Sequence, residues 1–483
     1  MTLAAASQRR RSPRAPVTTR PGLILAFLCV VQSMVYLDVT IVNVALPSIQ
    51  GSLDMADGDL QYVVTAYGTV LGGFLLLGGR LADILGRRRL LRVGMALFGV
   101  GSLVAGIAHD PGVLVTARAV QGLGAALTAP AALSTVTTVF SEGAARNKAL
   151  GIWGALAGVA SVLGVLFGGL LTQGPGWRWV FFINVPIALL AVVAAPYVVP
   201  ESRLPETKRR FDTAGAVSLT AGLLLLIYTF DQAVNVGWSA PRTISGLTGA
   251  AVLLAAFVTV ELRAEAPLLP LRIFRLPTLR AANIAMTLML GAMVTLFFFA
   301  SLFMQQVLDY DALRTGLAYV PLAAAVVVGA GLASGLVTKL PAKPVLMTGL
   351  ALSTAGLLLL ARLPVSAAYA PDVLPPFLLV GVGLGMSLVP VQISAATGVS
   401  GQEAGTAAGL INTSQEAGGA VGVAIASTVA FTHIGHLMSG PGHPALRAAR
   451  ASGFHEAFFI GSCFALAALV VAALLLPRMR PPA

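Results

Sequence analysis

Residues 37–47 read LDVTIVNVALP and place one carboxylate, Asp38, inside an apolar run that extends from residue 23 to residue 46. No other charged residue occurs in that run. About 24 residues at ~1.5 Å each give ~36 Å, which is long enough for a helix to cross a bilayer. A charged group at such a depth usually faces a protein interior or a wet cavity, where it pairs, binds a ligand or relays a proton. The alternative is that Asp38 satisfies backbone groups of a broken helix.

The composition of the whole chain indicates a polytopic membrane protein. Of the 483 residues, 57% are hydrophobic and only 10% are charged, and the mean hydropathy is +0.87. A soluble domain usually has about 25% charged residues. A net charge of +12 would suggest nucleic-acid binding in a soluble protein, but here the arginines lie in short loops between apolar runs. We therefore expect membrane lipids, and no nucleic acid, among the partners.

Fourteen apolar runs are long enough to be membrane-spanning helices. The first six lie at about residues 23–48, 61–79, 90–108, 112–138, 149–172 and 179–199. Two more lie at about 214–232 and 243–260, and the last six at about 281–305, 315–338, 344–362, 374–396, 404–431 and 454–476. This order predicts an all-α polytopic protein with two six-helix bundles and two extra helices, an arrangement typical of rocking transporters.

The same pattern predicts the domain organisation and the orientation of the chain. The predicted parts are a basic tail (1–22), an N-terminal six-helix bundle (23–200), a linker with two helices (201–280), a C-terminal six-helix bundle (281–477) and a second tail (478–483). Most of the 31 lysines and arginines fall on the side that holds both tails, and the loops of the opposite side contain only Arg178, Arg242, Arg314, Arg362, Arg447 and Arg450. Both termini are therefore expected in the cytoplasm, and the protein in the cytoplasmic membrane.

The loop after the second run combines one carboxylate with several arginines. It reads GRLADILGRRRLL at residues 79–91. Asp83 could accept hydrogen bonds from arginine or cap the start of a helix. A simple positively charged loop would explain the arginines but not the spacing of glycine and aspartate. The loop resembles the signature of the major facilitator superfamily, G-x-L-a-D-r-x-G-r-[RK]-x-x-L. The resemblance implies a conformational switch loop made of Gly79, Asp83, Gly86, Arg87 and Arg88.

Further stretches resemble motifs of the fourteen-helix drug:proton antiporter branch of that superfamily. They are LDVTIVNVALP, with Asp38 at its acidic position, RAVQGLGAA (118–126), WRWVFFINVP (177–186) and, in the second half, FMQQVLDYDALRTGLAYVP and AGTAAGLINTSQEAGGAVGVAI. The resemblance implies a bacterial transporter that acts as a monomer on small-molecule drugs or antibiotics and on protons.

The fifth run departs from that branch at one position. The antiporter motif normally has Gly-Pro before a pair of glycines, whereas this chain reads GVASVLGVLFGG with Val165 at the proline position. Without the proline, we expect a straighter helix. The glycine spacing still predicts a close contact with another helix. The glycines of this packing motif are Gly158, Gly164, Gly168 and Gly169.

Arg118 is a second charged residue within an apolar run. It lies ~9 Å from the outer end of its helix and Asp38 lies ~15 Å from the outer end of its own, so their depths are comparable. If both helices line a central cavity, as the resemblance implies, Arg118 can reach the carboxylate directly or through a water. Protonation of Asp38 would then release the arginine, a plausible coupling step. The alternative is a structural arginine that binds helix carbonyl groups.

Glu416 is the third deep charge, ~18 Å from the inner end of the thirteenth run. Asn412 and Thr413 precede it by four and three residues, so the three side chains share one helix face. We predict that Asp38, Asn412, Thr413 and Glu416 line the substrate cavity and that Asp38, Arg118 and Glu416 take part in proton coupling. Relatives commonly have glutamine at this position, so the acid could reflect this protein's own substrate. The alternative is a protonated Glu416 that only forms hydrogen bonds.

These observations predict proton-coupled efflux of small hydrophobic or amphipathic drugs and antibiotics. The alternative is a proton symporter or a uniporter for a metabolite or nutrient. An ATP-driven pump is excluded, because no lysine of the chain lies in the pattern G-x-x-x-x-G-K-[ST]. An enzyme would need a clustered catalytic set, which the sequence does not suggest. No cofactor and no metal site are predicted.

Overall fold

The computed structural model describes residues 20–55, 57–141, 143–202, 212–264, 269, 271–400, 403–439 and 445–477. Every regular element in these ranges is a helix. The helices of the first half are α1 (Pro21–Leu53), α2 (Asp57–Leu85), α3 (Arg87–Gly106), α4 (Pro111–Val139), α5 (Ala144–Gln173), α6 (Trp179–Phe182) and α7 (Asn184–Val198). They are followed by α8 (Thr213–Val236) and α9 (Pro241–Glu261). The second half contains η2 (Leu271–Arg275), α10 (Pro277–Gln306), α11 (Ala312–Ala318), α12 (Val320–Leu336), α13 (Ala342–Leu360), η3 (Tyr369–Val373), α14 (Leu374–Ala396), α15 (Ala404–Ser439) and α16 (Leu446–Leu475).

Thirteen helical segments of the described residues are long and apolar enough to cross a membrane. Three of these segments join a short helix to a longer one, namely α6 with α7, α11 with α12 and η3 with α14. Helix α5 is not among the thirteen, although it is 30 residues long and coincides with the fifth predicted run. The all-α polytopic fold is confirmed. The count of fourteen spans and the cytoplasmic position of both termini remain predictions.

Several helices extend beyond the apolar runs that predict them. Helix α16 begins at Leu446, eight residues before the predicted start at residue 454, and α15 continues to Ser439 instead of ending near residue 431. Hydropathy marks only the part of a helix that suits the hydrocarbon core, whereas backbone hydrogen bonds continue into the polar interface. The helix ends are therefore longer than the sequence pattern indicates.

Proline and aspartate define many of the helix starts. Pro21, Pro111 and Pro277 occupy the first turns of α1, α4 and α10, where a missing N–H costs nothing. Asp110 caps α4, because its side chain accepts hydrogen bonds from the N–H groups of Gly112 at 2.8 Å and Val113 at 3.1 Å.

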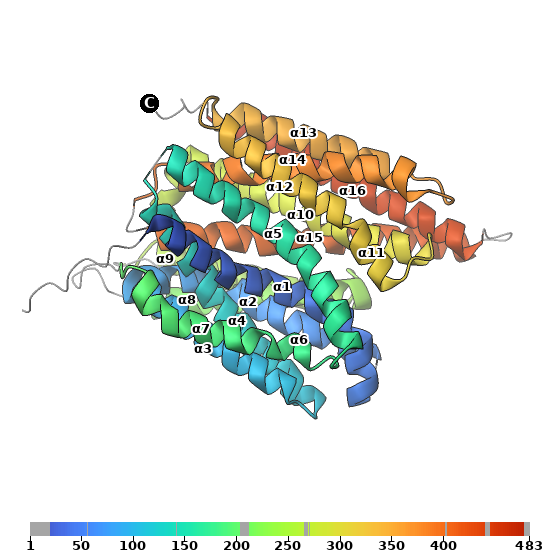
Figure 1. Cartoon of the computed structure of the whole chain (residues 1–483), viewed down its shortest axis with the longest axis horizontal. Helices are drawn as coiled ribbons and strands as arrows, with labels where there is room; N and C mark the ends of the chain where they lie inside the picture. The colour runs from blue at the N-terminus through green and yellow to red at the C-terminus, as the bar shows by residue number, and fades with distance from the viewer. Residues whose placement is uncertain are drawn as a thin grey trace, which may run out of the picture.

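Helices of the two halves form two groups in space. Figure 1 shows α1–α4, α6 and α7 in the lower part of the view and α10 and α12–α14 in the upper part. Within the first group α4 packs on α2 and α3, and within the second α14 packs on α12 and α13. Helices α5 and α15 connect the two groups, because α5 packs on α1 and α12, and α15 packs on α2 and α10. The predicted domain boundaries at residues 200 and 280 remain predictions.

The additional pair α8 and α9 covers one side of the contact between α2 and α15. Helix α8 packs on both of these helices. Gly72 and Gly73 of α2 leave room for Ile227 and Leu224 of α8, because a Cβ atom at either glycine would collide with those side chains. The surface of the molecule carries many large exposed apolar side chains, such as Leu474 at 77% exposure. Such a surface suits contact with lipid tails.

Candidate functional site

Asp38 of α1 and Arg118 of α4 form an ion pair inside the first group of helices. The Nη1 group of Arg118 donates a hydrogen bond to Asp38 Oδ2. Both residues are almost completely shielded, with 0% exposure for Asp38 and 1% for Arg118. The structure therefore brings together the two charges for which the sequence predicts comparable depths.

Two amide side chains complete the surroundings of the Asp38 carboxylate. Asn184, at the first residue of α7, donates to Asp38 Oδ1 at 2.9 Å, and Gln121 of α4 donates to the same oxygen at 3.2 Å. Gln121 is held in turn, because its amide donates to Ser102 Oγ at 2.7 Å and its carbonyl accepts from Arg118 at 3.0 Å. Two helices, α4 and α7, thus supply the donors that satisfy a charged carboxylate of α1 in an apolar interior.

Arg118 also contacts α2. Its Nε donates to the backbone carbonyl of Val63 at 2.8 Å, and its guanidinium carbon lies 4.4 Å from the centre of the Tyr67 ring. A planar guanidinium can make these contacts and pair with a carboxylate at the same time, which a lysine cannot. Arg118 therefore combines the two roles that the sequence leaves open, since it binds Asp38 and a helix carbonyl.

The geometry makes the protonation state of Asp38 consequential for its neighbours. A buried ion pair that loses one of its charges leaves the other uncompensated, at a cost of about 3–5 kcal/mol. A proton on Asp38 would remove the counter-charge of Arg118. It would thereby change the free energy of the contacts that join α4 to α1 and α2.

Glu416 lies on α15, and the hydrogen bonds that the structure shows for the Asp38 cluster do not include it. It is half-buried on α15, where Gly72 of α2 lies against its side chain. Its carboxylate is within electrostatic range of the phenol groups of Tyr36 on α1 and Tyr67 on α2. Tyr67 also contacts Arg118, the partner of Asp38.

Asn412 and Thr413 precede Glu416 on α15 and are both buried. The hydroxyl oxygen of Thr413 has no hydrogen-bond partner among the described residues. The helical spacing keeps these two residues with Glu416, whereas the partners that the structure shows for the Asp38 carboxylate lie on α4 and α7. A substrate cavity that includes all four residues remains a prediction.

Asp83 connects the end of α2 to the start of α15. Its carboxylate accepts hydrogen bonds from the backbone N–H groups of Gly405 at 3.0 Å and Thr406 at 2.9 Å. It also pairs with Arg87 at 3.2 Å, and it is only 2% exposed. A carboxylate at a helix N-terminus satisfies free N–H groups and interacts favourably with the helix dipole. Asp83 therefore caps a helix of the other half of the molecule.

The glycines and arginines of this loop have separate tasks. Gly79 lies so close to α15 that a Cβ atom would collide with the backbone of Gly405. Gly86 has a φ of 104°, a conformation that favours glycine. Arg87 donates to Thr138 Oγ1 at 2.9 Å, while Arg88 donates to the carbonyl of Pro196 at 3.3 Å. The predicted switch loop thus connects the end of α2 and the start of α3 to α4, α7 and α15.

The glycines of α5 differ in their surroundings. A Cβ atom at Gly164 would lie 3.1 Å from the carbonyl oxygen of Leu37, and one at Gly168 would lie 2.9 Å from Val44 Cβ, so both allow α5 to approach α1 closely. Gly169 has open space where a Cβ would be. Gly158 lies within α5, and its surroundings are outside the described part of the structure. The helix contact involves α1, which also carries Asp38.

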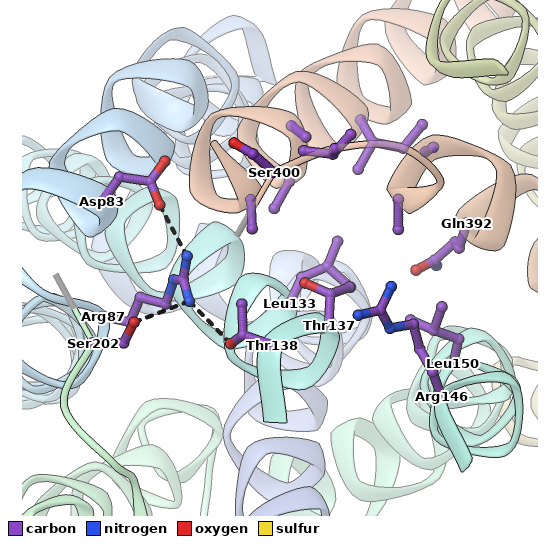
Figure 2. Close-up of a pocket in the computed structure, with 17 residues that line it drawn as sticks. Asp83, Arg87, Leu133, Thr137, Thr138, Arg146, Leu150, Ser202, Gln392 and Ser400 are labelled. Atoms are coloured by element: carbon purple, nitrogen blue, oxygen red, sulfur yellow. Dashed lines mark hydrogen bonds and ion pairs between the residues drawn. The ribbon is translucent and has the colours of Figure 1, made fainter. Parts of the chain in front are cut away.

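A cavity of about 610 Å³ lies beside Asp83, between the ends of α4, α5, α14 and α15. Its polar lining includes Arg87, Arg146 and Gln392, which Figure 2 shows around the open space. Its apolar lining comes mainly from leucine, valine, isoleucine and alanine side chains. The volume is in the range of pockets that hold drug-sized molecules.

Sequence reasoning did not assign roles to Gln121, Asn184 or Tyr67. A signal for Gln121 was present, because it follows Arg118 by three residues and so faces the same side of the helix. Asn184 begins an otherwise apolar run, and a buried amide in a membrane helix usually has a polar partner. Tyr67 carries no such signal, since aromatic residues are common in membrane spans.

Comparison with known proteins identifies the sequence relatives of the chain. The model of the Major Facilitator Superfamily matches residues 28–423. A puromycin resistance protein of Streptomyces alboniger is 37% identical over 454 residues, which cover 93% of this chain and 90% of that protein. A cephamycin export protein of Amycolatopsis lactamdurans is 38% identical over 470 residues, which cover 96% and 94%. A lincomycin resistance protein of Streptomyces lincolnensis is 36% identical over 433 residues, with 89% of each chain covered.

Solved structures share the arrangement of helices at low sequence identity. A human organic anion transporter superposes with a TM-score of 0.66 at 15% identity and covers 94% of this chain and 99% of its own. A proton:xylose symporter superposes with a TM-score of 0.64, also at 15% identity, over 95% of this chain and 96% of its own. At this level of identity the likeness concerns the fold.

Proposed function

The chain belongs to the Major Facilitator Superfamily, and from this we propose that it exports small hydrophobic or amphipathic antibiotics from the cell in exchange for protons. It is a multi-pass transporter of the cell membrane. Relatives named for antibiotic resistance or export cover most of its length, which favours efflux over uptake of a nutrient. The proposal includes no enzymatic step, and the acting unit is a monomer.

The observation that carries proton coupling is the completely shielded Asp38–Arg118 pair. The carboxylate has 0% exposure and is bound by an arginine and two amides. A charged group at such a place in a membrane protein is energetically costly, and residues of this kind usually take part in transport. When a proton from outside reaches Asp38, the attraction to Arg118 is lost, and the contacts of Arg118 with Val63 and Tyr67 of α2 change. A symporter or uniporter remains the alternative.

Helix α2 offers a path from this pair to the contact with α15. Val63 and Asp83 are 20 residues apart on one helix, which corresponds to ~30 Å. Movement of α2 at the Arg118 end would pull Asp83 away from the N-terminus of α15. When Asp38 is protonated, the two halves would thereby separate near Asp83 and Arg87.

The direct test of the proposal is transport in everted membrane vesicles. Uptake of an antibiotic such as puromycin or lincomycin is expected to need a pH gradient, because the proton on Asp38 drives the cycle. A protonophore should reduce uptake to the level of vesicles without the protein. Uptake that persists after the gradient has collapsed would contradict proton coupling and would favour a uniporter.

Glu416→Gln is expected to impair cationic drugs selectively. The half-buried carboxylate lies near two phenol rings, and no ion pair joins it to an arginine in the part of the chain that the structure describes, so its charge is suited to a cationic substrate. We expect transport of ethidium to fall about tenfold and that of a neutral antibiotic such as chloramphenicol to change less than twofold. Both rates are measured at equal protein abundance. Loss of both activities in this variant, with full activity in Asp38→Asn, would reverse the assignment of substrate and proton sites.

A further inference from the structure

The cavity beside Asp83 is separate from the deep acids. Residues of α4 and α5 from the first half and of α14 and α15 from the second half line its volume of about 610 Å³. Among the described residues, the lining includes neither Asp38 nor Glu416, and it includes neither Asn412 nor Thr413. A ligand in this cavity would therefore bind at a different place from the predicted substrate cavity, and it would contact both halves of the chain.

Gln392 of α14 is the side chain that indicates a ligand. It is only 6% exposed, and its Oε1 atom has no hydrogen-bond partner among the described residues. Figure 2 shows this amide oxygen on the side of the open space. A buried acceptor without a partner is energetically unfavourable, so the carbonyl group of Gln392 is suited to a hydrogen-bond donor that a ligand brings.

The nitrogen end of the same side chain is available as well. In the part of the chain that the structure describes, no residue accepts a hydrogen bond from Gln392 Nε2. A side-chain amide contains an acceptor and a donor side by side. A primary carboxamide or carbamate of a ligand has the same two groups in the same arrangement, so it can form two parallel hydrogen bonds with Gln392.

The rest of the lining suits an uncharged, apolar body. Leu133 of α4, Leu150 of α5 and Ile411 of α15 contribute branched side chains, and α14 and α15 contribute several alanines. The ionised residues of the lining are bound to other groups of the protein. Arg87 pairs with Asp83, and the Nε of Arg146 donates to a backbone carbonyl at 3.0 Å. The ligand that fits these surroundings therefore needs hydrogen-bonding groups and an apolar part, but no charge.

We propose that this cavity is a loading site for neutral amphipathic molecules that carry a primary carboxamide or carbamate. Gln392 accepts a hydrogen bond from the N–H group of the ligand and donates one to its carbonyl oxygen, while the apolar part lies against the leucine, isoleucine and alanine side chains. The role in loading rests on the proposed export function and on the predicted cytoplasmic position of this end.

Protection of a single thiol tests binding independently of transport. In a chain with Cys29→Ser and Cys463→Ser, the substitution Ala396→Cys places one thiol on the cavity wall. The protein is held in phosphatidylcholine nanodiscs and labelled with N-ethylmaleimide, which is uncharged. The probe 1-naphthamide should slow this labelling. Its N,N-dimethyl derivative has the same ring and carbonyl group but no N–H, so it should need a concentration about tenfold higher for the same protection.

The comparison of the two compounds needs no change at Gln392, so it is independent of how well a Gln392 variant folds. Equal protection by both compounds, or protection by neither, would overturn the proposal. In either case the unpaired amide would need no ligand beyond water.

Gln392→Met assigns the hydrogen bonds to this residue. Methionine keeps the length of the side chain and removes both hydrogen-bonding groups, so protection by 1-naphthamide should weaken about tenfold. Gln305→Met is the matched control, because Gln305 is an exposed glutamine of α10 that does not line the cavity. This control should keep the full protection. Protection that is unchanged in Gln392→Met would overturn the assignment of Gln392.

Inhibition of transport tests whether the cavity lies on the export route. In everted vesicles 1-naphthamide should inhibit puromycin uptake, and Gln392→Met should raise the concentration for half-inhibition about tenfold. Protection of the thiol without inhibition of uptake would overturn the role in loading. If puromycin is not taken up in response to a pH gradient, the proposed function fails, while protection of the thiol still decides whether the cavity binds amides.

Discussion

Asp38→Asn is expected to abolish efflux driven by a pH gradient, with a fall in the initial rate of about 100-fold or more. The amide cannot bind and release a proton, and it leaves Arg118 without a counter-charge in a completely shielded site. The measurement is antibiotic uptake into everted vesicles at equal protein abundance. Asp54→Asn is the matched control, because Asp54 is an exposed carboxylate at the end of the same helix, and asparagine tolerates its left-handed backbone.

A double variant separates the chemical role of Asp38 from a structural one. Asp38→Asn combined with Arg118→Gln removes both charges, so the protein should regain the stability that an unpaired arginine would cost. Transport coupled to the pH gradient should still be absent. Recovery of pH-driven transport in the double variant would show that the pair only holds the helices together.

Asp83→Asn is expected to slow transport about tenfold or more while the protein remains in the membrane at normal abundance. Asparagine can still accept a hydrogen bond, but it loses the charge that binds Arg87 and interacts with the dipole of α15. The contact between α2 and α15 should therefore open too readily, and the cycle should stall. One readout is the initial transport rate. The other is the labelling rate of a single thiol introduced by Ala396→Cys on the cavity wall, with Cys29 and Cys463 replaced by serine, and this rate should rise.

The control for this variant is Asp110→Asn. Asp110 caps α4 through the same kind of hydrogen bonds but is exposed and caps its own helix. Asparagine and aspartate are about equally good caps at such a position, so this variant should transport normally. Near-normal turnover of Asp83→Asn would indicate that the loop only sets the orientation of the chain in the membrane.

The residues that carry charge within the apolar runs were predictable from the sequence. Asp38, Arg118 and Glu416 stand out because ionised side chains are rare in apolar runs, and distance along a helix converts residue number into depth. The ion pair between Asp38 and Arg118 follows from this reasoning. Its amide partners do not, because the rotation of a helix about its axis relative to its neighbours is set by packing, which depth does not specify.

The role of Asp83 shows the same limit. The loop sequence indicates that this carboxylate binds an arginine or caps a helix, and the structure contains both interactions. The helix that it caps starts at Ala404, and Gly405 is 322 residues away from Asp83 in the chain. No local pattern can indicate a partner at that separation.

The sequence by itself determined the class of the protein, the all-α fold, the approximate spans and the residues that carry buried charge, because hydropathy, charge and helical spacing are local properties of the chain. Only the tertiary structure decided that Asn184 and Gln121 hold Asp38, that Arg118 lies over the ring of Tyr67, and that Arg146 and Gln392 line one cavity. These arrangements join helices from distant parts of the chain. Close packing at small residues fixes which faces meet, and that outcome depends on all the helices together.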